Sequence, residues 1–101
     1  MPGARTSLHE EAIAEARAVR RWYEERSPAA AAAFMEELDR AIAQIGEFPE
    51  AWPPYIAGTR RYILRRFPYS VVYRRRDAAV QIVAIAHHRR RPGYWKSRVK
   101  N

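Results

Sequence analysis

The chain has 101 residues and a formal net charge of +8, and it contains no cysteine. This length fits a single domain, residues 1–101, with one modest core. The missing cysteine excludes disulfides, thiolate metal sites and cysteine catalysis. No apolar run approaches the roughly 20 residues of a membrane helix, and the N-terminus "MPGARTSLHEE" lacks the apolar segment of a secretory signal. We therefore expect a soluble, cytoplasmic protein with no membrane partner.

Charge is distributed unevenly along the chain. Residues 1–59 hold six Lys and Arg and ten Asp and Glu, a net charge of −4. Residues 60–101 hold 13 basic residues and one acid, Asp77, a net charge of +12. So much positive charge over some forty residues favours an anionic partner, which could be nucleic acid, an acidic protein segment or an acidic surface, over a merely solvated surface.

Two helices are predicted in the acidic half, together spanning residues 7–46. Between Ser7 and Arg26 apolar residues recur at steps of three and four, and Ser7 with Glu10 forms a capping box. The second helix is capped by Ser27, with Pro28 at its first position, and Gly46 is expected to end it in a left-handed conformation. Because few residues separate the helices, we expect an antiparallel hairpin.

The segment "EFPEAWPPYIAGT" is rich in proline and reads as a loop, with Phe48, Trp52 and Tyr55 packed on the core. After it, hydrophobic residues recur with a period of two. We expect a three-stranded meander over residues 60–86, made of "RRYILRRF", "YSVVYRRR" and "AVQIVAIA", with a tight turn at Asp77 and Ala78.

The last of these strands is apolar on both faces. Val80, Ile82 and Ala84 are expected to face one way, and Val83 and Ile85 the other. The helical hairpin can cover one face, which predicts an α+β fold with the hairpin packed on one face of a small antiparallel sheet. Either the C-terminal segment or a partner then covers the second face. The final residues, "KSRVKN", are short and polar, and we expect them to be frayed.

Residues 87–101 form a basic C-terminal segment that begins with the dense cluster "HHRRRPGYW". His87 and His88 are adjacent, so in a strand they point to opposite faces and do not readily chelate one ion. We expect no metal and no cofactor. Histidines, arginines and a tyrosine could cleave a phosphodiester, but the same residue types bind phosphates, bases or carboxylates, and they favour binding.

The stretch "RRFPYSVVYRRRDAAVQIVAIAHHRRRPGYW", the helix "WYEERSPAAAAAFMEELDRAI" and the sequel "FPEAWPPY" closely resemble the RelE/ParE toxin family of bacterial type II toxin–antitoxin systems. The resemblance covers about residues 10–95. It implies a helical hairpin against an antiparallel sheet. Family members usually begin with an edge strand, and because "GARTS" is short and polar, we expect that strand to be short or missing here.

RelE-like members of the family cut messenger RNA on the ribosome, and ParE-like members poison DNA gyrase. The nuclease branch has lysines in the first strand of the meander, but here none precedes Lys96, and Ser70 rather than arginine follows Tyr69. These departures favour the ParE-like branch and a growth inhibitor that binds gyrase without turning over a substrate. The alternatives are a ribosome-dependent, metal-independent mRNA endoribonuclease and a degenerate member that binds only its antitoxin. If the chain were a nuclease, its catalytic residues would be His88, Arg65 and Tyr94.

The resemblance also implies a cognate antitoxin that wraps an acidic and apolar segment around the toxin, in a complex that can be a larger hetero-oligomer. We expect antitoxin contacts on the second face of the last strand and its basic border, at Arg74, Arg76, Val83 and Ile85. The expected target-binding residues share the C-terminal cluster, and they are His87, His88, Arg89, Arg90, Arg91 and Tyr94. Arginines scattered around the molecule, or a second face already sealed by the chain's own C-terminal segment, would remove the physical basis of the toxin interpretation.

Overall fold

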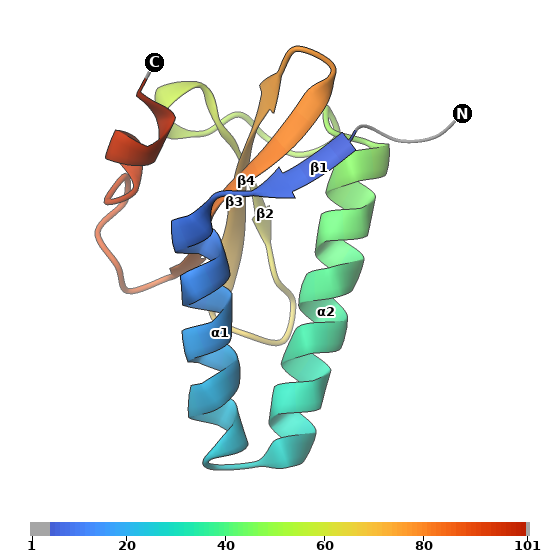
Figure 1. Ribbon diagram of the computed structural model, residues 1–101, viewed down its shortest axis with the longest axis vertical. Helices are drawn as coiled ribbons and strands as arrows, with labels where there is room; N and C mark the ends of the chain where they lie inside the picture. Colours follow the sequence, from blue (N-terminus) through green and yellow to red (C-terminus); the bar gives the residue numbers. More distant parts are fainter. Residues whose placement is uncertain (1–4, 101) are drawn as a thin grey trace.

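The computed structural model describes residues 5–100, which form a two-helix hairpin packed on a four-stranded sheet (Figure 1). The elements are, in chain order, β1 (Arg5–Leu8), α1 (Glu10–Glu24), α2 (Pro28–Glu47), η1 (Ile56–Gly58), β2 (Arg60–Ile63), β3 (Tyr69–Arg76), β4 (Ala79–His87) and η2 (Lys96–Val99). The strand order is β1-β4-β3-β2. The predicted α+β fold is confirmed.

The N-terminal edge strand is present and short. β1 pairs in parallel with the first half of β4, from Arg5 opposite Ala79 to Leu8 opposite Ile82. The sheet is therefore mixed, because the meander of β2, β3 and β4 is antiparallel. Gly3 and Ala4, which belong to the segment that seemed too polar for a strand, lie outside the described residues.

The start of α1 differs from the prediction. Ser7 lies in β1, opposite Gln81, and so it cannot cap the helix. His9 is the N-cap instead, and its Nδ1 accepts a hydrogen bond of 3.0 Å from the backbone N–H of Glu11. An imidazole nitrogen thus takes the place of the expected serine oxygen, because Ser7 is paired with β4 and lies two residues before the N-cap position.

The helix α2 begins as predicted and ends later. Ser27 Oγ accepts from the Ala30 N–H at 3.1 Å, with Pro28 in the first turn. Gly46 does not end the helix, since it is a buried residue inside α2, which continues to Glu47. Pro49 accounts for the end, because a proline disfavours helical geometry in the preceding residue, and Phe48 has φ −129° and ψ 65°.

The strand β2 is shorter than predicted and stops at Ile63. The Leu64 N–H still donates to Tyr69 O of β3, but the N–H groups of Arg65 and Arg66 that follow donate to the carboxylate of Glu37 in α2. Burial alone would raise the pKa of Glu37, but these bonds and the Arg66 guanidinium lower it below its usual value. A buried carboxylate therefore fixes the loop between β2 and β3 to the helical hairpin.

A bulge in β4 corrects the predicted assignment of its two faces. Val72 pairs with Ala84 but Tyr73 pairs with Ile82, so Val83 is an extra residue in the ladder. Val80, Ile82 and Ile85 consequently pack in the helix-side core, and Val83 and Ala84 pack on the opposite face. The predicted faces of Ala84 and Ile85 were wrong, because the extra residue Val83 shifts the alternation of side chains between the two faces for every residue after it.

The main core lies between the helices and the sheet. Phe34 of α2 is fully buried there, and its ring packs against Tyr23, Phe67 and Tyr69 with centroid distances between 5.5 and 5.9 Å. Trp52 of the proline-rich loop packs on Tyr62 as expected. Phe48 does not pack on the core, because 56% of its surface is exposed.

Candidate functional site

The second face of the sheet is covered by the chain's own C-terminal segment. After β4 the chain turns back, and Trp95 packs on Val72, Val83 and Ala84 with 1% of its surface exposed. Gly93 makes this return possible, since it adopts a φ of 81°, in the region that L side chains rarely occupy. Of the two expected covers, the C-terminal segment is the one that the described residues show. The apolar surface expected for a partner is therefore filled, and the toxin interpretation rests on other evidence.

This burial bears directly on two of the expected antitoxin contacts. Val83 is fully buried beneath Trp95, and Ile85 is 2% exposed because the bulge turns it toward the helices. Neither side chain presents surface to a partner. The expectation of an apolar antitoxin groove on this strand is therefore wrong for Val83 and Ile85.

A single carboxylate ties the C-terminal segment to α1. Glu15 accepts from the Tyr94 hydroxyl at 2.7 Å and from the Arg98 guanidinium at 2.9 and 3.0 Å. It also accepts from the Ile85 N–H at 2.9 Å, at a point of β4 beyond its pairing with β1. The residues "KSRV" form η2 rather than a frayed end, because Arg98 has this partly buried partner and donates to Val83 O at 3.1 Å.

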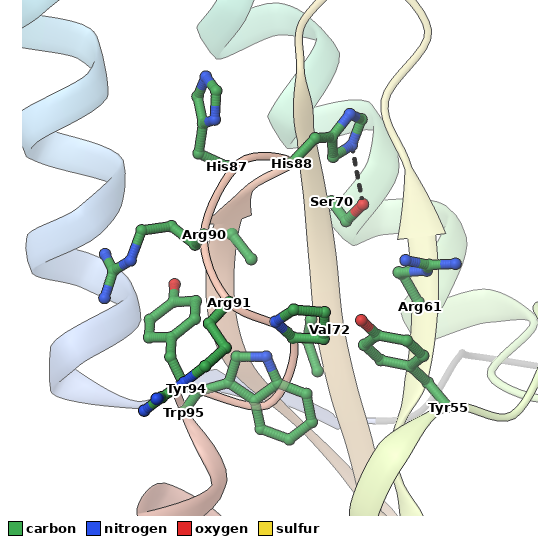
Figure 2. A pocket seen from close by; sticks show the side chains of 12 residues that line it. Tyr55, Arg61, Ser70, Val72, His87, His88, Arg90, Arg91, Tyr94 and Trp95 are labelled. Carbon is green, nitrogen blue, oxygen red and sulfur yellow. Dashed lines mark hydrogen bonds between the residues drawn. The ribbon is translucent and has the colours of Figure 1, made fainter.

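Beside Trp95 lies a pocket of about 100 Å³ that gathers most of the predicted cationic cluster (Figure 2). Its lining includes five of the six expected target-binding residues, namely His87, His88, Arg90, Arg91 and Tyr94. Arg89 is exposed and does not line the pocket. The sequence analysis did not predict three other polar residues of the lining, namely Tyr55, Arg61 and Ser70. They lie far from the C-terminal cluster in sequence, in the proline-rich loop, β2 and β3.

The register of the sheet places these missed residues. Arg61 of β2 pairs with Val72 of β3, and Ser70 pairs with Ala86 of β4. Arg61, Ser70 and Val72 alternate with residues of the helix-side core, so they share the face that carries Trp95. A correct pairing of the three strands was the signal that would have found them.

The two histidines point in different directions, as predicted for adjacent residues at a strand end. His88 Nε2 lies 3.0 Å from Ser70 Oγ, and Figure 2 shows its ring directed toward that serine. The His87 ring packs edge-on against Tyr69 with a centroid distance of 4.9 Å, and its Nδ1 accepts from the Arg89 N–H at 3.0 Å. His88 is therefore the histidine aimed at the pocket residues of β3.

Two arginines of the pocket stack on aromatic rings. The Arg90 guanidinium carbon lies 3.8 Å from the centroid of Tyr94, and that of Arg61 lies 4.2 Å from the centroid of Tyr55. Such stacking holds a guanidinium in place while leaving the N–H groups at its edge free to bind oxygen. The arrangement suits recognition of anionic groups.

The three residues expected to act in a nuclease are not brought together. His88 and Tyr94 line the same pocket, but Arg65 lines a different cavity with Glu37 and Tyr62. Burial, the hydrogen bond to Glu15 and the charge of Glu15 raise the pKa of Tyr94 well above its usual value. Its hydroxyl is thus a fixed donor rather than a group that accepts a proton near neutral pH.

The two arginines expected to bind the antitoxin differ in availability. Arg74 donates to Gln81 Oε1 at 2.9 Å and to Val99 O at 3.1 Å, so it helps to hold the C-terminal segment. Arg76 lies exposed at the end of the β3–β4 hairpin. The turn at Asp77 is confirmed, with a φ of 57°.

Residues 5–100 offer no group of three or more histidines and carboxylates placed to hold a metal ion. Over the same range, no helix combines the length and the apolar character needed to span a membrane.

Comparisons with known proteins place the chain among toxins. Residues 7–92 match a family model described as ParE toxin of type II toxin-antitoxin system, parDE. No curated protein matches the chain. A solved chain from a chromosomal ParDE TA system of P. aeruginosa shares 18% sequence identity, with a TM-score of 0.74 over 83% of this chain and 95% of that chain. At this identity the structural likeness shows the fold alone.

Proposed function

Because the family model covers residues 7–92, this chain belongs to the ParE toxins of type II toxin–antitoxin systems, and we propose that it inhibits growth by binding DNA gyrase. One observation carries the choice of a binding inhibitor over a nuclease. The Tyr94 hydroxyl donates to Glu15 within the network that anchors the C-terminal segment. A tyrosine held in this way stabilises the fold and is poorly suited to proton transfer.

The proposed contact surface for the target is the rim of the cationic pocket. Arg89, Arg90 and Arg91 are exposed and have no carboxylate within ion-pair distance among the described residues, whereas Arg98 next to them is paired with Glu15. Unpaired guanidinium groups at the surface bind a partner without first breaking an internal ion pair. His87, His88 and Tyr94 complete this proposed surface from the pocket wall.

We further propose that a cognate antitoxin neutralises the chain, as the pairing of toxin and antitoxin in the ParDE system suggests. Because the expected apolar groove is filled by Trp95, the proposed antitoxin contacts are the exposed cations. These are Arg76 at the hairpin and Arg89 to Arg91 after β4, which suit an acidic segment. The complex would act in the cytoplasm, in plasmid stabilisation or stress, and it can be a larger hetero-oligomer.

Induction of the chain in cells tests the target. A gyrase poison produces an SOS response and trapped gyrase–DNA complexes, and transcripts stay intact. Messenger RNA cut at defined codon positions would instead identify a nuclease. Normal growth with folded protein present would identify a member that binds only its antitoxin.

A matched pair of variants sharpens this experiment. Arg91→Glu reverses a charge on the pocket rim, and Arg65→Glu makes the same change beside a different cavity. We expect Arg91→Glu to reduce toxicity and antitoxin affinity, and Arg65→Glu to retain both. Equal behaviour of the two variants would refute the proposed contact surface.

A further inference from the structure

The pocket beside Trp95 is lined by basic side chains and by no acidic ones. Its lining contains three arginines and two histidines but no aspartate or glutamate. Three other cavities of the described residues that contain arginine also include a carboxylate, namely Glu37 of α2, Glu50 beside β2 and Asp39 between the helices. The absence of an internal counter-ion marks this pocket as a place for an external anion.

Arg61 is the most informative residue in the pocket. Its neighbour Arg60 is satisfied by Glu50, at 3.0 Å, and by Trp52 O, at 2.6 Å. Arg61 itself only stacks on Tyr55, and its guanidinium forms no hydrogen bond or ion pair with another described residue. It is therefore positioned by the ring, with its hydrogen-bond donors unused.

His88 and Ser70 add polar atoms to the same wall. Ser70 is 2% exposed, and its hydroxyl lies 3.0 Å from His88 Nε2. The other ring nitrogen of His88 forms no hydrogen bond within the described residues. Figure 2 shows Arg61 with Tyr55 on one side of the pocket and Arg90 with Tyr94 on the other. Cations thus flank the pocket on two sides.

The size of the pocket limits the ligand. A volume of about 100 Å³ is several times the roughly 30 Å³ share of one water in the liquid, so it admits a small tetrahedral anion. Planar guanidinium groups match the oxygen atoms of phosphate in geometry and charge. We infer that this pocket binds a phosphate group, held by Arg61 and His88, with Arg90 on the opposite side.

Two sources share this chemistry, namely the backbone of a nucleic-acid strand and a free phosphate. The cations on two sides of the pocket favour a strand, since a positively charged groove follows the successive phosphates of a nucleic-acid backbone. As a contribution to toxicity the inference rests on the proposed function, because gyrase works on DNA. Binding itself is measured without gyrase, and so the two proposals can fail separately.

The experiment is an NMR titration of the whole chain with inorganic phosphate and, separately, with a short oligothymidylate. We expect saturable shifts of the backbone amides of Arg61, Ser70 and His88 with both probes, and tighter binding of the oligonucleotide. Arg61→Ala should weaken binding about tenfold, as expected for the loss of a charge-assisted hydrogen bond. Arg61→Lys retains the charge without the planar stack and should fall between the two.

Arg65→Ala is the matched control. It removes the same charge four residues later in the sequence, beside the α2 cavity, and it leaves the backbone bond to Glu37 intact. We expect its binding to equal that of the original chain. Equal weakening by Arg61→Ala and Arg65→Ala would show diffuse attraction, and absence of saturable shifts would exclude the site; either result overturns the inference.

The two probes also separate the sources. Tight binding of phosphate with no gain for the oligonucleotide would overturn the strand as the source. Normal gyrase inhibition by Arg61→Ala, despite its lost phosphate binding, would remove the pocket from the toxic mechanism while leaving the proposed target in place.

Discussion

The two faces of the sheet are built in different ways. The helix-side face is an apolar core in which Phe34, Leu38 and Ile45 of α2 meet strand residues such as Val71. The opposite face has a much smaller apolar cluster, centred on Trp95, and next to it the cationic pocket. One face holds the fold together, and the other joins a small core to a surface suited to a charged partner.

The difference lies in what covers each face. Two regular helices cover the first, whereas a turn, η2 and a few side-chain bonds cover the second. Short segments held by few contacts open more easily than packed helices. We therefore expect the helix-side face to govern global stability and the Trp95 face to govern local opening and binding.

The largest effect is expected for Phe34→Ala. Phe34 is fully buried among three aromatic rings, so its removal should lower the free energy of unfolding by about 3–5 kcal/mol. Urea denaturation measures this loss. Trp22→Ala is the control, because Trp22 is 49% exposed. A loss of stability as large as that of Phe34→Ala would show that burial in the helix-side core is not the cause of the effect.

Trp95→Ala should have a smaller global effect, about 2–3 kcal/mol, although Trp95 is as buried as Phe34. The C-terminal segment can separate from the sheet while the helix-side core remains folded. Hydrogen exchange should show faster exchange in residues 94–99 and little change in α2. A loss equal to that of Phe34→Ala, with exchange raised throughout, would mean that both faces belong to one cooperative core.

Glu15→Gln should have the smallest effect, about 1–2 kcal/mol. The amide oxygen can still accept from the Ile85 N–H, but the ion pair between Glu15 and Arg98 is lost. Hydrogen exchange of η2 should rise more than exchange of the Ile85 amide. Glu24→Gln is the control, since its pair with Arg20 is exposed and contributes little, and equal losses would show that Glu15 is no anchor.

Local patterns predicted the helix-side face well and the opposite face poorly. Periodicity found both helices, the strands β3 and β4 and the turn at Asp77, because each depends on neighbours in sequence. It missed the bulge at Val83, the β1–β4 pairing and the Glu15–Arg98 contact, which join distant residues. The same limit applies to the pocket. Its residues between His87 and Tyr94 were predicted because they are close in sequence, whereas Arg61 and Ser70 reach the pocket only through the pairing of β2, β3 and β4.

The proposed toxic contact lies at the pocket beside Trp95. Purified gyrase, supercoiled DNA and the chain can be combined, and covalently trapped, cleaved DNA can be measured after denaturation. We predict that trapped DNA accumulates with the original chain and with Arg65→Ala, and falls sharply with the Arg90→Ala, Arg91→Ala double variant at an unchanged urea midpoint. Undiminished trapping by the double variant, or no trapping by the original chain, would contradict the account.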